Sequence, residues 1–237
     1  MPHKVSNLKV SELKESSNYI KPYRMSFLQD GQPRTWDGIL AHDSVSILLY
    51  HAEKKSLLFV KQFRPVVYYT KLRQLGVIPS VSDGTVESIQ TDLPSGEIGE
   101  TLELCAGLID GVQTNPKSVA VQEVLEECGF KISEESLKLV NSFYTSVGLT
   151  GSKMTLYYAE VYEHQRIPNA GGGLHTEGEY IEVIEWPISK IDELYHQNNN
   201  NNNSNDCTKL SISVTLLYAV CWFKENILST LSLPLAA

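Results

Sequence analysis

The sequence predicts an α/β fold with an antiparallel β segment at its N-terminus. Two strongly apolar stretches joined by the polar turn "HAEKK", residues 44–65, have the composition of buried strands. A helix with clear start and stop signals follows at 115–129, and the apolar run 210–223 has the length of a buried helix. With 237 residues, 42% of them hydrophobic, the chain is long enough to bury a sizeable core.

The N-terminal β segment is predicted from alternating apolar and polar residues. This alternation runs through residues 17–42, and Asp30-Gly31 in its middle suits the turn of a hairpin. We therefore divide the chain into an N-terminal β segment, residues 1–43, and a main domain, residues 44–237.

Glycine, proline and polar residues mark the element boundaries of the main domain. Residues 76–100 are rich in Gly, Pro, Ser and Asp without a sustained period, which predicts a long flexible loop. A strand is predicted at 101–110. The next helix has Asn115 as its N-cap, Pro116 in its first position and Gly129 at its end.

The C-terminal half is predicted to return to the sheet. We expect, in order, strands at 139–149 and 153–163, a Gly-rich loop leading into a strand across 169–187, a helix start at 189–195, a disordered Asn-rich insertion at 197–206, and a buried C-terminal helix.

Composition excludes several classes of function. A formal net charge of -8 argues against a nucleic-acid-binding surface, which needs clustered Lys and Arg. The four cysteines lie far apart without a C-x-x-C pair, so we expect neither a zinc site nor a disulfide framework, and a reducing, cytoplasmic location is the default. No signal-like apolar region begins the chain, and the apolar run at 210–223 is shorter than the roughly 20 residues that span a bilayer, so no membrane role is predicted.

Three glutamates converge on one face of the helix at 115–129. Glu123, Glu126 and Glu127 are spaced i, i+3 and i+4, and like charges at this spacing destabilise a helix by a few tenths of a kcal/mol per pair. A divalent cation with oxygen ligands would relieve the repulsion. A solvated acidic face explains the spacing equally well, so the spacing alone leaves both interpretations open.

The surrounding residues favour the metal. The segment "GLIDGVQTNPKSVAVQEVLEECGF" resembles the Nudix box, G-x5-E-x7-R-E-U-x-E-E-x-G-U with U apolar. Gly107 matches its first glycine, and the match is complete over "EVLEECGF". Gln122 stands in place of the arginine, Gln113 falls where the first acidic residue is expected, and one extra residue separates Gly107 from Glu123.

The resemblance extends over roughly residues 35–230 and narrows to one branch. The segments "ELCAGLID", in which Cys105 replaces a proline, "VKQFRP", "YTSVGLTGSKMTLYYAEV" and "GGGLHTEGEYIEVIEWP" are similar to the UDP-sugar pyrophosphatases of animals. This resemblance implies an α/β/α sandwich with a mixed sheet and an N-terminal β region, a homodimer, and Mg²⁺ as cofactor with Mn²⁺ as a substitute.

The implied reaction is hydrolysis of the pyrophosphate bond of a nucleoside diphosphate sugar, with UDP-glucose giving UMP and glucose 1-phosphate. ADP-ribose pyrophosphatase is one alternative, because pocket contacts choose the nucleotide. A catalytically weakened nucleotide-binding module is the other, because of Gln122 and Gln113.

The resemblance also assigns the metal ligands. Glu123 and Glu127 are expected as side-chain ligands, Glu126 as a member of the same cluster, and Ala106 as a ligand through its backbone carbonyl. Phosphoryl chemistry requires that the charge on the phosphate oxygens be neutralised and that a water molecule be activated. Divalent metal ions do both.

The loop "HTEGEYIEV" is expected to supply the catalytic base. The resemblance favours Glu177 as the base, with Glu179 as a further metal ligand, whereas Glu182 is expected only to pack or to face solvent. An exposed acidic hinge is the alternative interpretation of this loop.

Substrate contacts are predicted from charge and backbone freedom. Arg64 is the preferred phosphate-binding cation because a guanidinium bridges two phosphate oxygens, and Lys61 is a weaker candidate. Gly148 and Gly151 permit a close approach of backbone to substrate, or merely form a hairpin turn. Trp36 and the Tyr68-Tyr69 pair are possible base-stacking residues, although large aromatics more often pack in a core or an interface.

Overall fold

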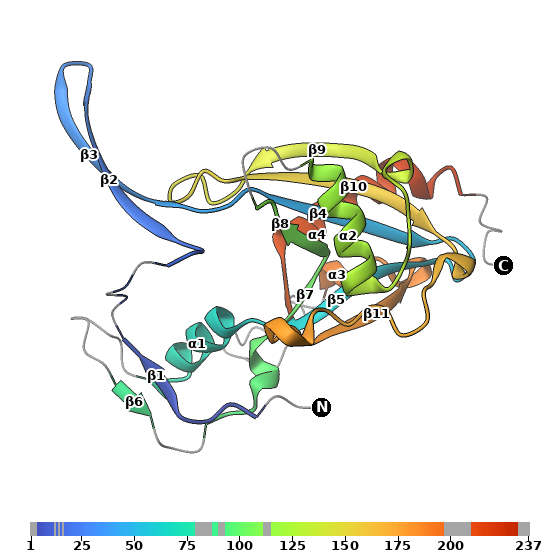
Figure 1. Ribbon diagram of the computed structural model, residues 1–237, viewed down its shortest axis with the longest axis horizontal. Helices are drawn as coiled ribbons and strands as arrows, with labels where there is room; N and C mark the ends of the chain where they lie inside the picture. Colours follow the sequence, from blue (N-terminus) through green and yellow to red (C-terminus); the bar gives the residue numbers. More distant parts are fainter. Residues whose placement is uncertain are drawn as a thin grey trace.

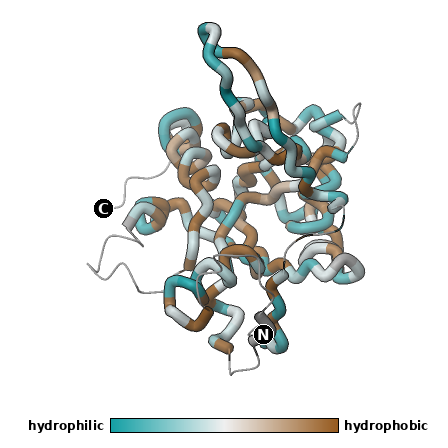
Figure 2. The backbone as a smooth tube through the Cα atoms, turned by 90° about the vertical axis from the view of Figure 1, so that its left-hand side faces the viewer, coloured by the Kyte–Doolittle hydropathy of each residue, from teal (hydrophilic) through white to brown (hydrophobic). Residues whose placement is uncertain are grey.

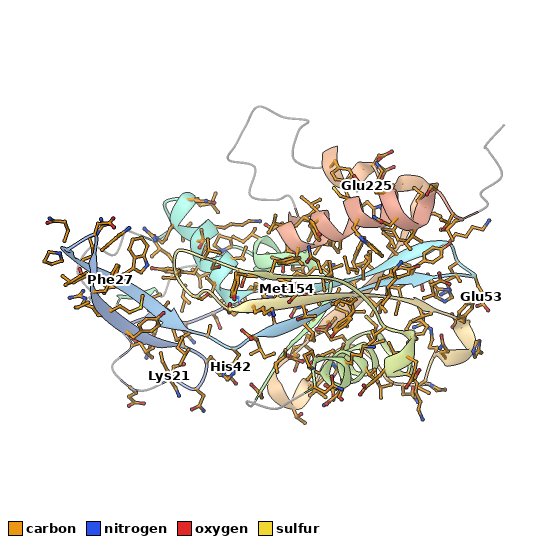
Figure 3. All side chains as sticks on the ribbon, turned by 90° about the horizontal axis from the view of Figure 1, so that it is seen from above. Lys21, Phe27, His42, Glu53, Met154 and Glu225 are labelled. Carbon is orange, nitrogen blue, oxygen red and sulfur yellow. The ribbon has the colours of Figure 1, made fainter. Side chains whose placement is uncertain are left out.

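A mixed β-sheet separates two helical layers in the computed structural model. Figure 3 shows the sheet across the middle, with α4 (Val214–Phe223) on one side and α2 (Pro116–Cys128) on the other. The described residues are 4–11, 13, 15, 17–78, 87–89, 93–110, 115–196 and 210–231. The three-layer α/β arrangement expected from the sequence is therefore confirmed.

The central sheet has the strand order β12-β7-β5-β4-β10-β9, with β11 added beside β5 and β8 beside β4. β4 pairs with β10, and β12 with β7, in parallel, and the other pairs of this sheet are antiparallel. The bounds are β4 Ser44–His51, β5 Ser56–Phe63, β7 Glu100–Glu103, β8 Cys105–Leu108, β9 Lys138–Tyr144, β10 Lys153–Val161, β11 Ile181–Pro187 and β12 Ser211–Ile212.

Strand β4 is buried on both faces, which explains its continuous apolar sequence. Its odd-numbered residues, such as Ile47, pack with Ala120 and Val124 of α2. Its even-numbered residues, such as Leu48, pack with Leu216 of α4. The period of two along one strand thus supplies both cores.

The predicted single strand at 101–110 was wrong, because two strands occupy this stretch. β4 and β5 pair only near their turn, and further along β8 pairs with β4 while β7 pairs with β5. Both added strands are antiparallel to their neighbours, so the chain reverses between them at the buried Leu104. The central strands splay apart around this bend.

The expected N-terminal hairpin is confirmed and projects from the body (Figure 1). It consists of β2 (Lys21–Gln29) and β3 (Gln32–Leu40), and both turn residues, Asp30 and Gly31, have positive φ angles of 52° and 78°. These angles match the type I′ turn that suits the twist of two-residue hairpins. Figure 2 shows hydrophobic residues along this projecting arm.

A small third cluster, formed around helix α1 (Pro65–Gln74), was not predicted. Tyr68 and Leu72 of α1 pack against Leu8 of β1 (Leu8–Val10), which pairs with β6 (Glu87–Ile89). The predicted loop 76–100 therefore contains a strand, and also a 3-10 turn at Gly96–Gly99. Residues 79–86 and 90–92 of this predicted flexible loop lie outside the described residues.

The predicted buried helix in the apolar run 210–223 is confirmed except at its start. Ser211–Ile212 form strand β12 beside β7, and the helix begins only after the N-cap Ser213. A short helix α3 (Glu193–His196) follows the predicted helix start, whereas the Asn tract lies outside the described residues. Within the part of the chain described, no helix combines the length and apolar character needed to cross a membrane.

Candidate active site

A cavity of about 840 Å³ opens where β4 and β5 splay apart around the bend at Leu104. Five carboxylates line it: Glu103, Asp110, Glu123, Glu127 and Glu179. Arg64 is the one Lys or Arg side chain among the described residues of the lining. The cavity is therefore strongly acidic, with a single guanidinium at its wall.

Glu127 is the most deeply buried of these carboxylates, with only 4% of its surface exposed. The backbone N–H of Ala106 in β8 donates to its Oε2 at 2.9 Å. The pKa of Glu127 is raised to about 8, mainly by burial; hydrogen bonds from Ala106 and Cys105 oppose the shift, and the carboxylates of Glu123 and Glu179 add to it. Helix α2 thus presses a carboxylate into a site that disfavours its charge.

Glu123, one turn earlier on α2, lies directly over β8. A Cβ added to Gly107 would stand 1.9 Å from its Oε1, far inside van der Waals contact. Gly107 is therefore the residue that leaves room for this carboxylate, which explains the glycine of the sequence motif in steric terms.

The end of α2 is held by backbone contacts that only glycines permit. Gly129 caps the helix with a φ of 76°, and its absent Cβ would lie 2.6 Å from the carbonyl oxygen of Ala170. Gly171 in turn approaches the backbone of Gly129. The "GGG" loop can therefore pack directly against the helix end.

This loop delivers Glu179 to the cavity. The N–H groups of Gly172 and Gly173 donate to the carbonyls of Glu127 and Glu126 at 2.9 and 3.0 Å, satisfying groups at the helix C-terminus. The chain then turns back into β11, and Glu179 joins the cavity lining. The backbone of Glu177 lies in the 3-10 turn His175–Glu177, but its side chain is outside the described set.

Arg64 faces the same cavity and makes a bidentate ion pair with Glu103. Its Nε and Nη2 donate to the two carboxylate oxygens at 2.7 and 2.8 Å. The hydrogen bond with Glu103 raises the pKa of Arg64, and Glu127 and Glu179 add to the effect through space. Burial alone would raise the pKa of Glu103, but hydrogen bonds from Arg64 and Thr101 lower it overall.

Glu126 differs from its two helix neighbours. It is not among the described residues that line the cavity. Its Oε1 accepts a hydrogen bond from Gln122 Nε2 at 2.9 Å. The glutamine in place of the motif arginine therefore offers an uncharged donor to Glu126 on the helix surface. Glu123, Glu127 and Glu179 line one cavity, whereas Glu126 is not among its lining residues.

The other predicted substrate residues lie away from the cavity lining. Lys61 pairs with Glu182 at 2.6 Å and with Glu100 at 3.5 Å. Gly148 and Gly151 belong to the β9–β10 loop, where the Gly148 carbonyl accepts from Trp36 Nε1 at 3.1 Å. Glu182 is 61% exposed, in line with its predicted solvent-facing position.

The aromatic residue at the cavity is one that sequence reasoning missed. Tyr19 lines the wall, and its backbone N–H donates to Ser17 Oγ at 3.1 Å. The predicted stackers do not take this position: Tyr68 is buried with its hydroxyl on the Pro94 carbonyl, and Trp36 lies on the hairpin. Tyr19 precedes the hairpin in an irregular segment, and the alternation at 17–42 predicted the hairpin but no position at the cavity.

Comparison with known sequences identifies relatives across most of the chain. No protein-family model matches it. It is 41% identical over 175 residues to the uridine diphosphate glucose pyrophosphatase of Bos taurus, covering 73% of this chain and 78% of the relative. It is 36% identical over 219 residues to the enzyme of that name from Mus musculus, covering 92% and 93%.

The chain belongs to the Nudix hydrolase family. A GDP-mannose pyrophosphatase of Shigella flexneri is 31% identical over 152 residues, 64% of this chain and 63% of that protein. The crystal structure of an ADP compounds hydrolase matches with a TM-score of 0.59 at 15% identity, over 98% of this chain and 99% of that chain. The Nudix fold predicted from the sequence is thereby confirmed.

The donor atoms in this Nudix cavity suit a hard divalent cation. Carboxylate oxygens dominate the lining, and the carboxylates of Glu123 and Glu179 repel that of the buried Glu127. Among the described residues, no three His, Cys, Asp or Glu side chains already stand together in a group that could hold an ion. Binding a metal ion would therefore require side-chain rotation or a donor beyond those described.

The contact between Gly129 and Ala170 predicts a specific sensitivity to substitution. We expect Gly129→Ala to lower the free energy of unfolding by about 3 kcal/mol, because left-handed strain adds to a backbone clash. Gly76→Ala is the matched control, since Gly76 has a φ of +70° and nothing within 4 Å of the added Cβ. Its cost should be about 1 kcal/mol in denaturant unfolding. Equal costs would show that the loop contact adds no constraint.

Proposed function

We propose that this protein hydrolyses the pyrophosphate bond of nucleoside diphosphate sugars, with UDP-glucose converted to UMP and glucose 1-phosphate. The observation that carries the proposal is the cavity whose lining includes Glu123, Glu127 and Glu179 together with Arg64. The names of the relatives that are 36% and 41% identical support the choice of substrate.

We further propose Mg²⁺ as the cofactor, with Mn²⁺ as a substitute. Glu123, Glu127 and Glu179 would hold it, and Glu126 stays a weaker candidate because it does not line the cavity. Ala106 supports a backbone ligand: its N–H points to Glu127, and in an antiparallel strand the carbonyl of the same residue points to the same side. When bound, the metal would neutralise phosphate oxygens and activate water.

The side chains have distinct roles in this proposal. Arg64 binds a phosphate of the substrate through N–H groups that do not face Glu103. Glu177, on the turn just before Glu179, accepts the proton of the attacking water. Tyr19 offers a flat apolar surface at the wall for the nucleobase.

Two other functions remain candidates. ADP-ribose is the alternative substrate for the same reaction, since pocket contacts choose the nucleotide. A nucleotide-binding module without turnover is the second alternative from the sequence, and the relatives named as pyrophosphatases argue against it. The buried, mutually repelling carboxylates favour the enzyme, because a binding module has no need of them.

The exposed hairpin supports a homodimer. Tyr23, Met25 and Phe27 alternate along β2, and Met25 lies opposite Trp36 of β3, so these four side chains share one face. They are 41%, 44%, 43% and 48% exposed. We propose that a second copy of the chain covers this face.

We also propose a cytoplasmic location. Cys105, Cys128 and Cys221 are free thiols, which suits a reducing compartment.

A hydrolysis screen tests the function. We expect release of UMP from UDP-glucose in the presence of Mg²⁺, faster than AMP from ADP-ribose, and loss of activity with chelator. Glu127→Gln should lower kcat/KM on the order of 100-fold or more, since it removes a carboxylate that would ligate the metal ion while keeping an acceptor for Ala106. Glu126→Gln, on the same helix, should cost less than about tenfold. Turnover that survives Glu127→Gln would contradict the metal assignment.

The space around Gly107 gives a second test. In Gly107→Ala the added methyl group displaces Glu123, and we expect kcat/KM to fall by about 10- to 100-fold, as small displacements of catalytic groups do. Gly148→Ala is the matched control. It adds the same methyl group, but nothing lies within 4 Å of the added Cβ. Unchanged activity in Gly148→Ala would also argue against the substrate contact that the sequence predicted there.

The dimer can be tested by light scattering. The wild type should show about twice the mass of 26.5 kDa expected for one chain, and Met25→Glu should return it to one. Ser26→Glu places the same charge on the opposite face of β2 and should leave the dimer intact. A monomeric wild type at micromolar concentration would refute the proposal.

A further inference from the structure

Arg64 is held both through its backbone and through its guanidinium group. The backbone of Arg64 is fixed, because its N–H donates to the Gly99 carbonyl at 2.9 Å and its carbonyl accepts from Tyr68 at 3.0 Å at the start of α1. The side chain beyond this point is long and 45% exposed. A freely rotating arginine would lose rotamer entropy on binding a phosphate.

Glu103 removes this freedom. Both of its oxygens bind Arg64, at 2.7 and 2.8 Å, in the planar fork geometry that fixes the orientation of a guanidinium. The pair uses Nε and one side of Nη2, so the remaining N–H groups point away from Glu103. Both residues line the cavity, which places those N–H groups beside it.

Glu103 is itself braced. Thr101 Oγ1 donates to Glu103 Oε1 at 2.5 Å, and Thr101 is buried on β7. The strand is held in register by β5, with Val60 opposite Glu103. The orientation of Arg64 is therefore transmitted from the sheet through two side chains, Thr101 and then Glu103.

The clamp also separates Arg64 from the other carboxylates. Glu127 and Glu179 attract Arg64 through space, and both belong to the same cavity wall. Without Glu103, the guanidinium would be drawn toward them and would present fewer donors to a ligand. A bidentate partner at its side is the arrangement that keeps the cation directed at an anion.

We propose that Glu103, braced by Thr101, is a positioning residue that holds Arg64 in the orientation that binds a phosphate group of the substrate. The identity of that substrate rests on the proposed function, but the positioning role does not. It applies to any diphosphate that the cavity admits.

The test uses inorganic pyrophosphate with Mg²⁺ and isothermal titration calorimetry on the full-length protein. We expect Glu103→Gln to weaken binding about tenfold. A single hydrogen bond from Arg64 to the amide oxygen then replaces the two hydrogen bonds to a charged carboxylate. Arg64→Lys should weaken binding by a similar factor. In the Arg64→Lys background, Glu103→Gln should then have little further effect, since it acts through Arg64.

Two further variants control for folding and for loss of any ion pair. Thr101→Val preserves the shape of the side chain and the charge of Glu103 but removes the brace, and should weaken binding two- to threefold. Glu185→Gln breaks a comparable pair with Lys54 on the same sheet, outside the cavity lining, and should change nothing. Thermal unfolding checks each variant, and Thr101→Val keeps the test decisive if Glu103→Gln does not fold.

The outcomes separate the positioning role from the proposed function. Pyrophosphate binding that depends on Glu103 only when Arg64 is present supports the inference, even if no nucleotide sugar is hydrolysed. An equal loss from Glu103→Gln in both backgrounds, or no pyrophosphate binding by the wild type, overturns it. With hydrolysis established, the same variants should raise KM more than they lower kcat, and a loss confined to kcat would assign Glu103 a different role.

Discussion

The burial of one carboxylate determines how the rest of the site is arranged. Glu127 is enclosed between α2 and β8, and the N–H of Ala106 is available to it because β8 turns away from β5 at Leu104. In a continuous strand, that N–H would donate a hydrogen bond to a neighbouring strand of the sheet. The bend in the chain, the cavity and the helix position are thus consequences of the same backbone geometry.

Electrostatic strain around Glu127 is the cost of this arrangement. Its pKa of about 8 reflects burial first and the neighbouring carboxylates second. Five carboxylates against one guanidinium leave the lining with a net negative charge, which repels a diphosphate. A bound cation would remove this repulsion, and the lining would then accept an anionic diphosphate.

The sequence predicted the parts of the fold that depend on local patterns. The paired strands β4 and β5, the hairpin turn at Asp30–Gly31 and the caps of α2 at Asn115 and Gly129 follow from burial periodicity and backbone preferences. It failed where tertiary contacts decide. Nothing local marks the reversal at Leu104, and α1 is held by a cluster with β1 from far along the chain.

The site was predicted unevenly for the same reason. Helical spacing placed Glu123 and Glu127 together, but it could not show that Glu126 turns toward Gln122. Arg64 was found from its charge, whereas its partner Glu103 and the wall residue Tyr19 required the three-dimensional structure. Glycine was informative in a different way: the positions of Gly107 and Gly129 have steric explanations that only the neighbouring elements reveal.

The cavity draws its walls from segments that are distant in the chain, beginning at Tyr19 and ending at Thr215 near the start of α4. During synthesis, the wall at Thr215 therefore becomes available only after every other segment of the lining. A truncated product that ends before α4 would carry every acidic residue of the lining but not a closed cavity. All the acidic residues of the lining therefore precede its last wall in the order of synthesis.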